Sequence, residues 1–132
     1  MKKKVHIALV GGQTMPVILG IKESFPDEII LVHSGKSESE AKLIENLCSE
    51  KCYLQEFTPV DYETIKVSVD KLLHNLTGDE ITINLSGGTK PWVLSFALQT
   101  QGMKNVTLLY IDQNSICYNY TQQKNGQVRV SV

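Results

Sequence analysis

Two short loops combine glycines, hydroxyl side chains and a proline in nearly the same order. The first loop reads LVGGQTMP at residues 9–16, and the second reads LSGGTKP at residues 85–91. Glycines let a backbone approach a ligand closely, and a proline near the first turn favours the start of a helix. Each loop would therefore aim unpaired backbone N–H groups and the positive end of a helix dipole at a bound anion.

The side chains of these loops favour a ligand that carries phosphate. Lys90 supplies a mobile positive charge in the second loop, while Thr14, Ser86 and Thr89 supply hydroxyl donors. A glycine pair after a strand also serves a plain tight turn, and this is the alternative for either loop taken alone. The occurrence of two similar loops in one short chain favours the anion site.

Familiar nucleotide-binding motifs are absent from both loops. Neither has the G-x-x-x-x-G-K-S/T spacing that wraps a triphosphate, and neither is G-x-G-x-x-G. The second apolar run of the chain ends LVHSG and lacks the acid that would hold the ribose diol of NAD. The motifs therefore argue against an NTPase and against a dehydrogenase.

Short apolar runs predict the strands that must carry these loops. They lie at residues 5–10, 29–32, 53–57, 81–85 and 106–111. Such nearly continuous runs, rich in β-branched residues, are typical of parallel strands that are covered on both faces.

Helical patterns separate the predicted strands. Ser37 is a predicted N-cap, with Glu40 reaching back to complete a capping box before the next helix. Asp61 is a predicted cap for the following helix. That helix has one apolar face, made by Ile65, Val69, Leu72, Leu73 and Leu76.

The alternation of strands and helices predicts an α/β fold. We expect a Rossmann-like, doubly wound, mostly parallel sheet of order about 3-2-1-4-5, with helices on both faces, in a single domain over residues 1–132. In this order strands 1 and 4 are neighbours, so both glycine loops would flank one site. Residues 116–120 and 128–132 alternate apolar and polar positions on either side of KNG at 124–126, which predicts a C-terminal antiparallel hairpin with an Asn-Gly turn.

Charge and composition exclude several partners. Thirteen Lys and Arg residues against fourteen Asp and Glu residues give a formal net charge of -1, and Arg129 is the only arginine, so we expect no duplex nucleic acid as partner. No apolar run approaches the roughly 18 residues of a membrane span. Cys48, Cys52 and Cys117 include no second ligand pair for zinc, so we expect reduced thiols in a cytoplasmic protein, without a metal or a cofactor.

The segment after the second loop is apolar nearly all round. Residues 92–98 read WVLSFAL, whereas a helix on the outside of a layered domain buries one stripe. The excess favours a second partner, most simply a twofold-related copy of the chain. Coverage by the C-terminal hairpin is the alternative. Trp92 and the tyrosines are interpreted as core or interface residues, while Asp112 and Gln113 could touch an adenine edge.

These residues together resemble a CARF domain, the CRISPR-associated Rossmann-fold sensor. The resemblance covers nearly the whole chain and is carried by HIALVGG, by ILVHSGKSESEAKLI and above all by INLSGGTKPWVLSFAL. It implies a homodimer that binds a cyclic oligoadenylate, with cyclic tetra-adenylate favoured, in type III CRISPR antiviral signalling. The ligand-binding residues implied are Gly11, Gly12, Gln13, Thr14, Ser34, Ser86, Gly87, Gly88, Thr89 and Lys90.

Larger members of this family attach an RNase with an R-x(4-6)-H signature or a DNA nuclease with a D...E-x-K core. Here no histidine follows Arg129, and the E-x-K of Glu40 to Lys42 lies on a predicted helix with no catalytic strand around it, so we expect that no effector is encoded. The chain is accordingly expected to be a stand-alone sensor, a ring nuclease or a fragment of a longer effector protein, with a separate or fused effector as partner. As a ring nuclease it would cleave the ligand by metal-independent attack of a 2'-OH, with Lys90 as the catalytic charge. His6 and His74 are expected to have structural roles. For His33, a structural role and a position facing the ligand crevice remain alternatives. A nucleotide- or phosphate-binding domain unrelated to this system is the third reading.

Overall fold

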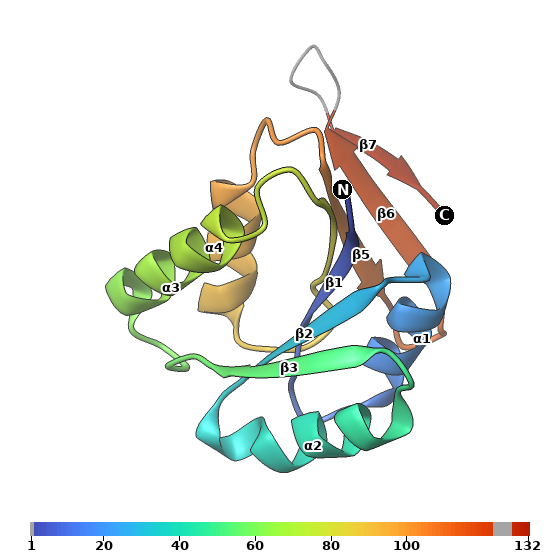
Figure 1. Cartoon of the computed structure of the whole chain (residues 1–132), viewed down its shortest axis with the longest axis vertical. Coiled ribbons are helices and arrows are strands. Elements are labelled where there is room, and N and C mark those ends of the chain that lie inside the picture. The colour runs from blue at the N-terminus through green and yellow to red at the C-terminus, as the bar shows by residue number, and fades with distance from the viewer. Residues whose placement is uncertain (1, 123–127) are drawn as a thin grey trace.

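The computed structural model describes residues 2–122 and 128–132. Within them the strands form one seven-stranded sheet of order β3-β2-β1-β4-β5-β6-β7 (Figure 1). Strands β1 to β5 pair in parallel, and β6 and β7 join in antiparallel pairing. The predicted fold and strand order are thus confirmed. The predicted Asn-Gly turn at residues 125–126 lies outside the described residues.

The elements alternate along the chain as the apolar runs predict. The strands are β1 (Lys4–Leu9), β2 (Glu28–His33), β3 (Lys51–Glu56), β4 (Glu80–Asn84), β5 (Val106–Ile111), β6 (Cys117–Gln122) and β7 (Val128–Ser131). The helices are α1 (Met15–Ser24), α2 (Glu38–Leu47), α3 (Tyr62–His74) and α4 (Lys90–Gln99), with a short 3₁₀ turn at Gly35–Ser37. No helix among the described residues is long and apolar enough to cross a membrane.

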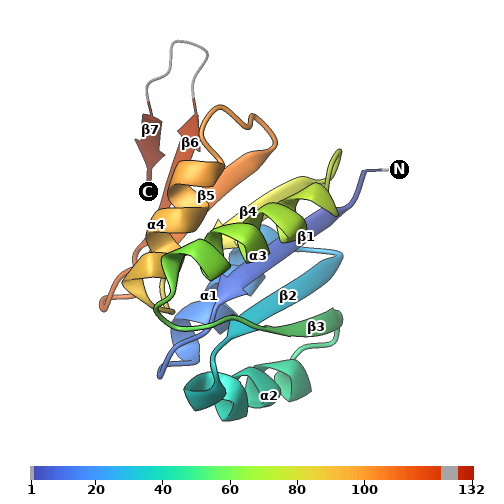
Figure 2. The ribbon, with the colours of Figure 1, turned by 90° about the vertical axis from the view of Figure 1, so that its left-hand side faces the viewer.

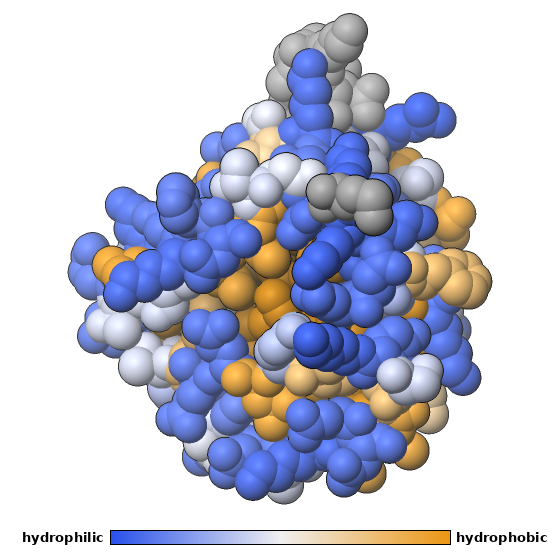
Figure 3. Space-filling model, in the orientation of Figure 1, coloured by the Kyte–Doolittle hydropathy of each residue, from blue (hydrophilic) through white to orange (hydrophobic). Residues whose placement is uncertain are grey.

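Helices cover both faces of the sheet. Figure 2 shows α3 and α4 together on one face, with α1 behind the sheet. Strand β1 and the residue after it divide their side chains between the two layers. Ile7 and Leu9 pack with α3 and α4, while Ala8 and the following Val10 pack with α1 and α2. In the space-filling view, apolar residues gather in the hollow between α3 and β1, within a largely polar surface (Figure 3). The central strand is therefore buried on both sides, as its unbroken apolar run predicts.

The predicted helix starts are correct in position, but their side-chain bonds differ from the prediction. Ser37 is the N-cap of α2, yet Glu40 does not reach back to it; the Glu40 carboxylate instead accepts a hydrogen bond from Ser39 Oγ at 2.8 Å. The 3₁₀ turn brings Ser37 Oγ within 3.0 Å of the Ser34 amide, which donates to it. Asp61 is the N-cap of α3, and its carboxylate accepts from Thr64 Oγ1 at 2.9 Å.

Helix α4 is buried on one side only. Trp92 and Phe96 are fully buried, and Trp92 Nε1 donates to the Thr58 carbonyl at 2.7 Å. Leu94 and Leu98 remain 57% and 53% exposed. The described part of the hairpin continues the sheet beyond β5 and does not cover these leucines, so the alternative that the hairpin buries the apolar excess is wrong.

Candidate anion-binding site

The two glycine loops meet backbone to backbone. Strands β1 and β4 are parallel neighbours, with Ile7 opposite Ile83, so their carboxyl ends emerge side by side. A methyl group on Gly11 would lie 3.1 Å from the amide nitrogen of Gly88. A methyl group on Gly87 would collide with the Leu9 carbonyl oxygen. The close approach of the loops therefore depends on the absence of side chains at these positions.

Gly88 is required for a second reason. Its φ of +80° lies in the left-handed region, and a methyl group there would lie 2.7 Å from the Trp92 ring. This turn leads into Thr89, the N-cap of α4, whose Oγ1 accepts a hydrogen bond from the Trp92 amide at 3.4 Å. The Thr89 hydroxyl oxygen is thus engaged in starting the helix, and its hydrogen is left to donate outward.

Both loops present bare amides. Across the described residues, several backbone N–H groups of the loops donate no hydrogen bond to the protein: those of Gly12, Gln13, Thr14, Gly87, Gly88 and Thr89. The Ser86 amide differs, because it donates to Asn84 Oδ1 at 3.0 Å. Two helix starts with free N–H groups, placed next to each other, form an arrangement that attracts negative charge.

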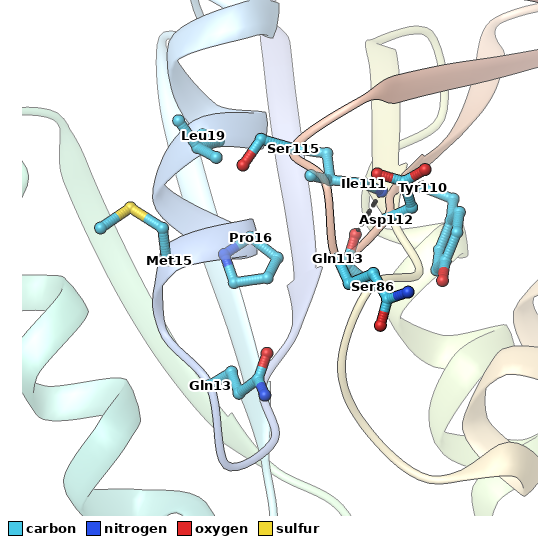
Figure 4. Close-up of a pocket in the computed structure, with 10 residues that line it drawn as sticks. All are labelled: Gln13, Met15, Pro16, Leu19, Ser86, Tyr110, Ile111, Asp112, Gln113 and Ser115. Atoms are coloured by element: carbon cyan, nitrogen blue, oxygen red, sulfur yellow. Dashed lines mark hydrogen bonds between the residues drawn. The ribbon is translucent and has the colours of Figure 1, made fainter.

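A pocket of about 250 Å³ lies beside these loops, between the start of α1, the loop after β4 and the turn from β5 to β6 (Figure 4). Ser86 faces it from the second loop, and the Ser86 Oγ accepts a hydrogen bond from the Ile111 amide at 2.8 Å. The pocket is lined by Gln13, Met15, Pro16, Leu19, Ser86, Tyr110, Ile111, Asp112, Gln113 and Ser115. Its walls are therefore mixed polar and apolar, which suits a ligand that has both polar groups and flat rings.

The residues predicted to bind the ligand fall into three groups. Gln13 and Ser86 line the pocket, and the Gly12 backbone is open, with no atom within 4 Å of the place where a side chain would start. Lys90 is exposed as the first residue of α4, and within the described part of the chain it has no ion-pair partner. The loop glycines Gly11, Gly87 and Gly88 pack closely through their backbones, next to the helix caps Thr14 and Thr89.

Ser34 lies apart from the pocket. It follows β2, and Val32, two residues earlier, pairs with Leu9 of β1. The Ser34 Oγ lies 3.4 Å from Ser37 Oγ, and Ser34 does not line the pocket. The structure therefore places Ser34 at the same edge of the sheet, one strand away from the two loops.

The end of β5 and the turn after it supply residues that the sequence left uncertain. Tyr110, interpreted as core or interface, is 40% exposed and lines the pocket. The Asp112 carboxylate is occupied within its own turn, since Oδ1 accepts from the amides of Asn114 and Ile116 at 2.9 Å each and Oδ2 accepts from Tyr118 OH at 3.3 Å. Gln113, in contrast, is exposed at the pocket.

None of the three histidines lines this pocket. His33 is 4% exposed, and its Nδ1 is 2.9 Å from the Ser34 carbonyl oxygen. His6 is completely buried with its Nδ1 2.8 Å from Ser24 Oγ, and burial lowers the pKa of His6 to about 3. His74 lies exposed on α3.

Among the described residues, no cluster of His, Cys, Asp and Glu could hold a metal ion.

Comparison with known proteins identifies related chains. A family model described as the Card1 CARF domain matches residues 5–132. Can2 from Sulfobacillus thermosulfidooxidans, solved with cyclic tetra-adenylate, is 16% identical with a TM-score of 0.76; the match covers 96% of this chain and 36% of Can2. Csm6 from Enterococcus italicus, bound to cyclic hexa-2'-fluoro-hexa-dAMP, is 15% identical with a TM-score of 0.68, covering 86% of this chain and 35% of that one.

A third solved structure is a type III CRISPR defence DNA nuclease activated by cyclic oligoadenylate. It is 17% identical with a TM-score of 0.60, and the match covers 97% of this chain and 21% of the nuclease. No curated protein matches the chain. The chain thus spans little more than a third, or less, of the length of the solved structures that it resembles.

Proposed function

The chain belongs to the Card1 CARF domain family, and from this premise we propose that it binds a cyclic oligoadenylate at the paired glycine loops. The observation that carries the proposal is the contact between Gly11 and Gly88, which sets two rows of free amides side by side. A ring of adenylates carries a phosphate for every base, so it offers anions to the loops and flat rings to the adjoining pocket.

The proposed ligand contacts follow from the surroundings of each residue. Free amides of Gly12, Gly87 and Gly88 would donate to phosphate oxygens, and the exposed Lys90 ammonium would add charge. Gln13, Ser86 and Gln113 would meet the ribose or a base edge in the pocket, and the exposed ring of Tyr110 would lie beside a base. Ser34 would contact a more distant part of a large ring.

Isothermal titration calorimetry tests this function directly. The full chain is titrated with cyclic tetra-adenylate and, separately, with cyclic hexa-adenylate. We expect micromolar or tighter binding of the tetra-adenylate and weaker binding of the hexa-adenylate. Linear tetra-adenylate and ATP serve as controls for simple phosphate affinity. If neither ring binds at micromolar concentrations, the proposed function is wrong.

We further propose that the binding unit is a homodimer formed through α4. Leu94 and Leu98 are one turn apart on this helix and are both more than half exposed. Past α4 the sheet continues with an apolar face. Residues that pair across neighbouring strands point to the same face. One such row runs across the sheet through Ile83, Leu108, Tyr120 and Val130. Val130 is 51% exposed. A helix with exposed leucines beside an uncovered apolar sheet face suits a twofold interface.

A dimer through α4 would also suit the ligand. The second glycine loop leads directly into α4. A twofold axis near α4 would therefore bring the two copies of this loop toward one another. A cyclic tetra-adenylate is itself twofold symmetric and would contact both copies alike. Its binding would change the relative pose of the two subunits, and through that change it would act on a separate or fused effector.

A further inference from the structure

One buried side chain joins the two glycine loops. Asn84 is the last residue of β4 and is completely buried. Its Nδ2 donates to the Pro16 carbonyl oxygen at 3.2 Å, and its Oδ1 accepts from the Ser86 amide at 3.0 Å. Pro16 lies in the first turn of α1, and Ser86 opens the second loop. A single amide group therefore ties the start of one helix to the loop that starts the other.

The connection continues to a third element of the pocket. Ser86 Oγ accepts a hydrogen bond from the Ile111 amide, drawn in Figure 4, so the end of β5 is linked to the same residue. The bonds run from Pro16 through Asn84 and Ser86 to Ile111. Three of these four residues, Pro16, Ser86 and Ile111, line the pocket, while Asn84 lies behind them.

Helix α1 leaves space for this amide by having a glycine at its centre. A methyl group on Gly20 would collide with Asn84 Nδ2 and would lie 3.3 Å from Leu109 Cδ2. Glycine inside a helix lowers stability relative to alanine, because it loses more backbone freedom on folding. The close approach of Asn84 to α1 gives a physical reason for glycine at this place.

We propose that Asn84 is a positioning residue for the anion site: its amide fixes the distance between the α1 start and the loop after β4. The inference rests on the proposed function, because the anion site is the one proposed above. By holding the Ser86 amide, Asn84 fixes the start of the backbone segment that carries the next amides, those of Gly87 and Gly88. An amide suits this place because one planar group both donates and accepts. An ionised carboxylate has no donor for Pro16, and a buried unpaired group is costly.

The variant Asn84→Asp tests the proposal, because the pH controls whether the introduced carboxyl group is protonated. Near neutral pH the ionised carboxylate of this variant would repel the Pro16 carbonyl, and we expect about tenfold or more weaker binding of cyclic tetra-adenylate. At about pH 5 a buried carboxyl with a raised pKa would be protonated, donate to Pro16 and accept from Ser86. Most of the affinity should then return. Asn105→Asp is the matched control, since Asn105 Nδ2 also donates to a backbone carbonyl, that of Asp79, at the opposite end of the sheet.

Two results would overturn the proposal. One is a folded Asn84→Asp protein that binds as tightly as the wild type at both pH values. The other is a loss of affinity that is the same at both pH values, because a purely structural defect would not follow protonation of one carboxyl. If Asn84→Asp does not fold, Gly20→Ala is the second variant. Its methyl group would displace the Asn84 side chain, while alanine raises the helix propensity of α1. We expect Gly20→Ala to weaken binding about tenfold, and unchanged affinity would overturn the proposal.

Amide chemical shifts of the ligand-free protein separate this inference from the proposed function. In Asn84→Asp, the ¹⁵N-¹H signals of Gly87, Gly88 and Thr14 should move near neutral pH and return toward wild-type positions at about pH 5. If the wild type fails to bind either ring while these signals behave as expected, the proposed ligand is wrong and the positioning role stands. If the signals do not respond, the positioning role is wrong even where the ring binds.

Discussion

The backbone of Gly11 lies against the backbone of Gly88, so that a methyl group on Gly11 would be 3.1 Å from the Gly88 nitrogen. The loop after β1 and the loop after β4 are therefore one packed unit rather than two independent turns. Any side chain between them must separate the two helix starts or distort a strand end. Stability and the geometry of the site thus depend on the same contact.

Replacing Gly87 by alanine should separate the loops. The added methyl group would collide with the Leu9 carbonyl oxygen and lie 2.9 Å from the Gly11 nitrogen. We expect a loss of about 1–3 kcal/mol in the free energy of unfolding, the usual cost of overpacking. Chemical denaturation measures it. Gly35→Ala is the control, because no atom lies within 4 Å of a methyl group at that position. Equal stability of the two variants would contradict the packing described here.

Removing the Lys90 side chain should affect binding without affecting the fold. Lys90 is exposed, and within the described residues no acidic side chain pairs with it. For Lys90→Ala we expect a loss of about 1.5–3 kcal/mol in the binding free energy of cyclic tetra-adenylate, the range for hydrogen bonds to charged groups. The melting temperature should stay nearly constant.

Calorimetric titration of Lys90→Ala beside Lys42→Ala, an exposed lysine on α2, isolates the local effect from net charge. The Lys42→Ala protein should bind like the wild type. A large drop in melting temperature with unchanged affinity would mean that Lys90 supports the fold instead of the ligand.

Much of the fold was predictable because local pattern and burial agree. The run that forms β1 is apolar at successive positions because Ile7 and Ala8 face different helix layers, and both are buried. The type and spacing of Ser37 and Asp61 before their apolar stripes predict helix caps, and both positions are correct. The partner of each cap was not predictable, because Ser37 Oγ bonds the Ser34 amide only when the 3₁₀ turn has formed.

The candidate site was predictable in its loops but not in its support. Glycine pairs and helix-starting prolines are visible as local patterns. The bond from Asn84 to Pro16 spans 68 positions and depends on strand order, and no local pattern indicates it. The exposure of Tyr110 is likewise a consequence of β5 ending beside the pocket. Long-range packing decides these features, which a single sequence does not reveal.

Introducing charge on α4 should dissociate the proposed dimer. Leu94 and Leu98 are exposed in the single chain, so Leu94→Glu should leave the fold intact and prevent an apolar interface from closing. We expect the variant to sediment as a monomer at micromolar concentrations at which the wild type is a dimer. Leu43→Glu on α2 is the control, since Leu43 is 49% exposed on another helix. A wild-type monomer, or a dimeric Leu94→Glu protein, would refute the α4 interface.

Stability should decrease in acid because of His6. Burial lowers the pKa of folded His6 to about 3, whereas the unfolded chain should titrate near 6.5. Between these values the unfolded state binds the extra proton, so the free energy of unfolding is greatest above about pH 6.5 and falls by up to about 1.4 kcal/mol per pH unit below it.

Denaturation curves between about pH 7 and pH 4 measure this dependence on His6. His6→Leu removes the titrating ring and should flatten the acid slope, while His74→Gln, at an exposed position on α3, should not. An unchanged slope in His6→Leu would show that other groups cause the acid sensitivity.

The bound ring should remain intact. In ring cleavage, a 2'-OH of the ligand attacks the adjacent phosphate. The protein can assist by taking up the proton of this hydroxyl, or by aligning the hydroxyl and stabilising the charge of the phosphorane. His33 is buried with Nδ1 beside the Ser34 carbonyl oxygen, and the Asp112 carboxylate is bound to two amides and a tyrosine hydroxyl of its own turn. Lys90 offers charge at the loop, but neither of these groups is free to act beside it as a base. We therefore expect binding without turnover.

Incubation of the protein with excess cyclic tetra-adenylate in EDTA, followed by chromatography over several hours, measures the turnover. Only the intact ring should be recovered, from the wild type and from Lys90→Ala alike. Appearance of linear products ending in a 2',3'-cyclic phosphate would favour the ring-nuclease reading. Loss of those products in Lys90→Ala, at ligand concentrations that saturate both proteins, would then assign Lys90 a catalytic role, because the comparison removes its contribution to affinity.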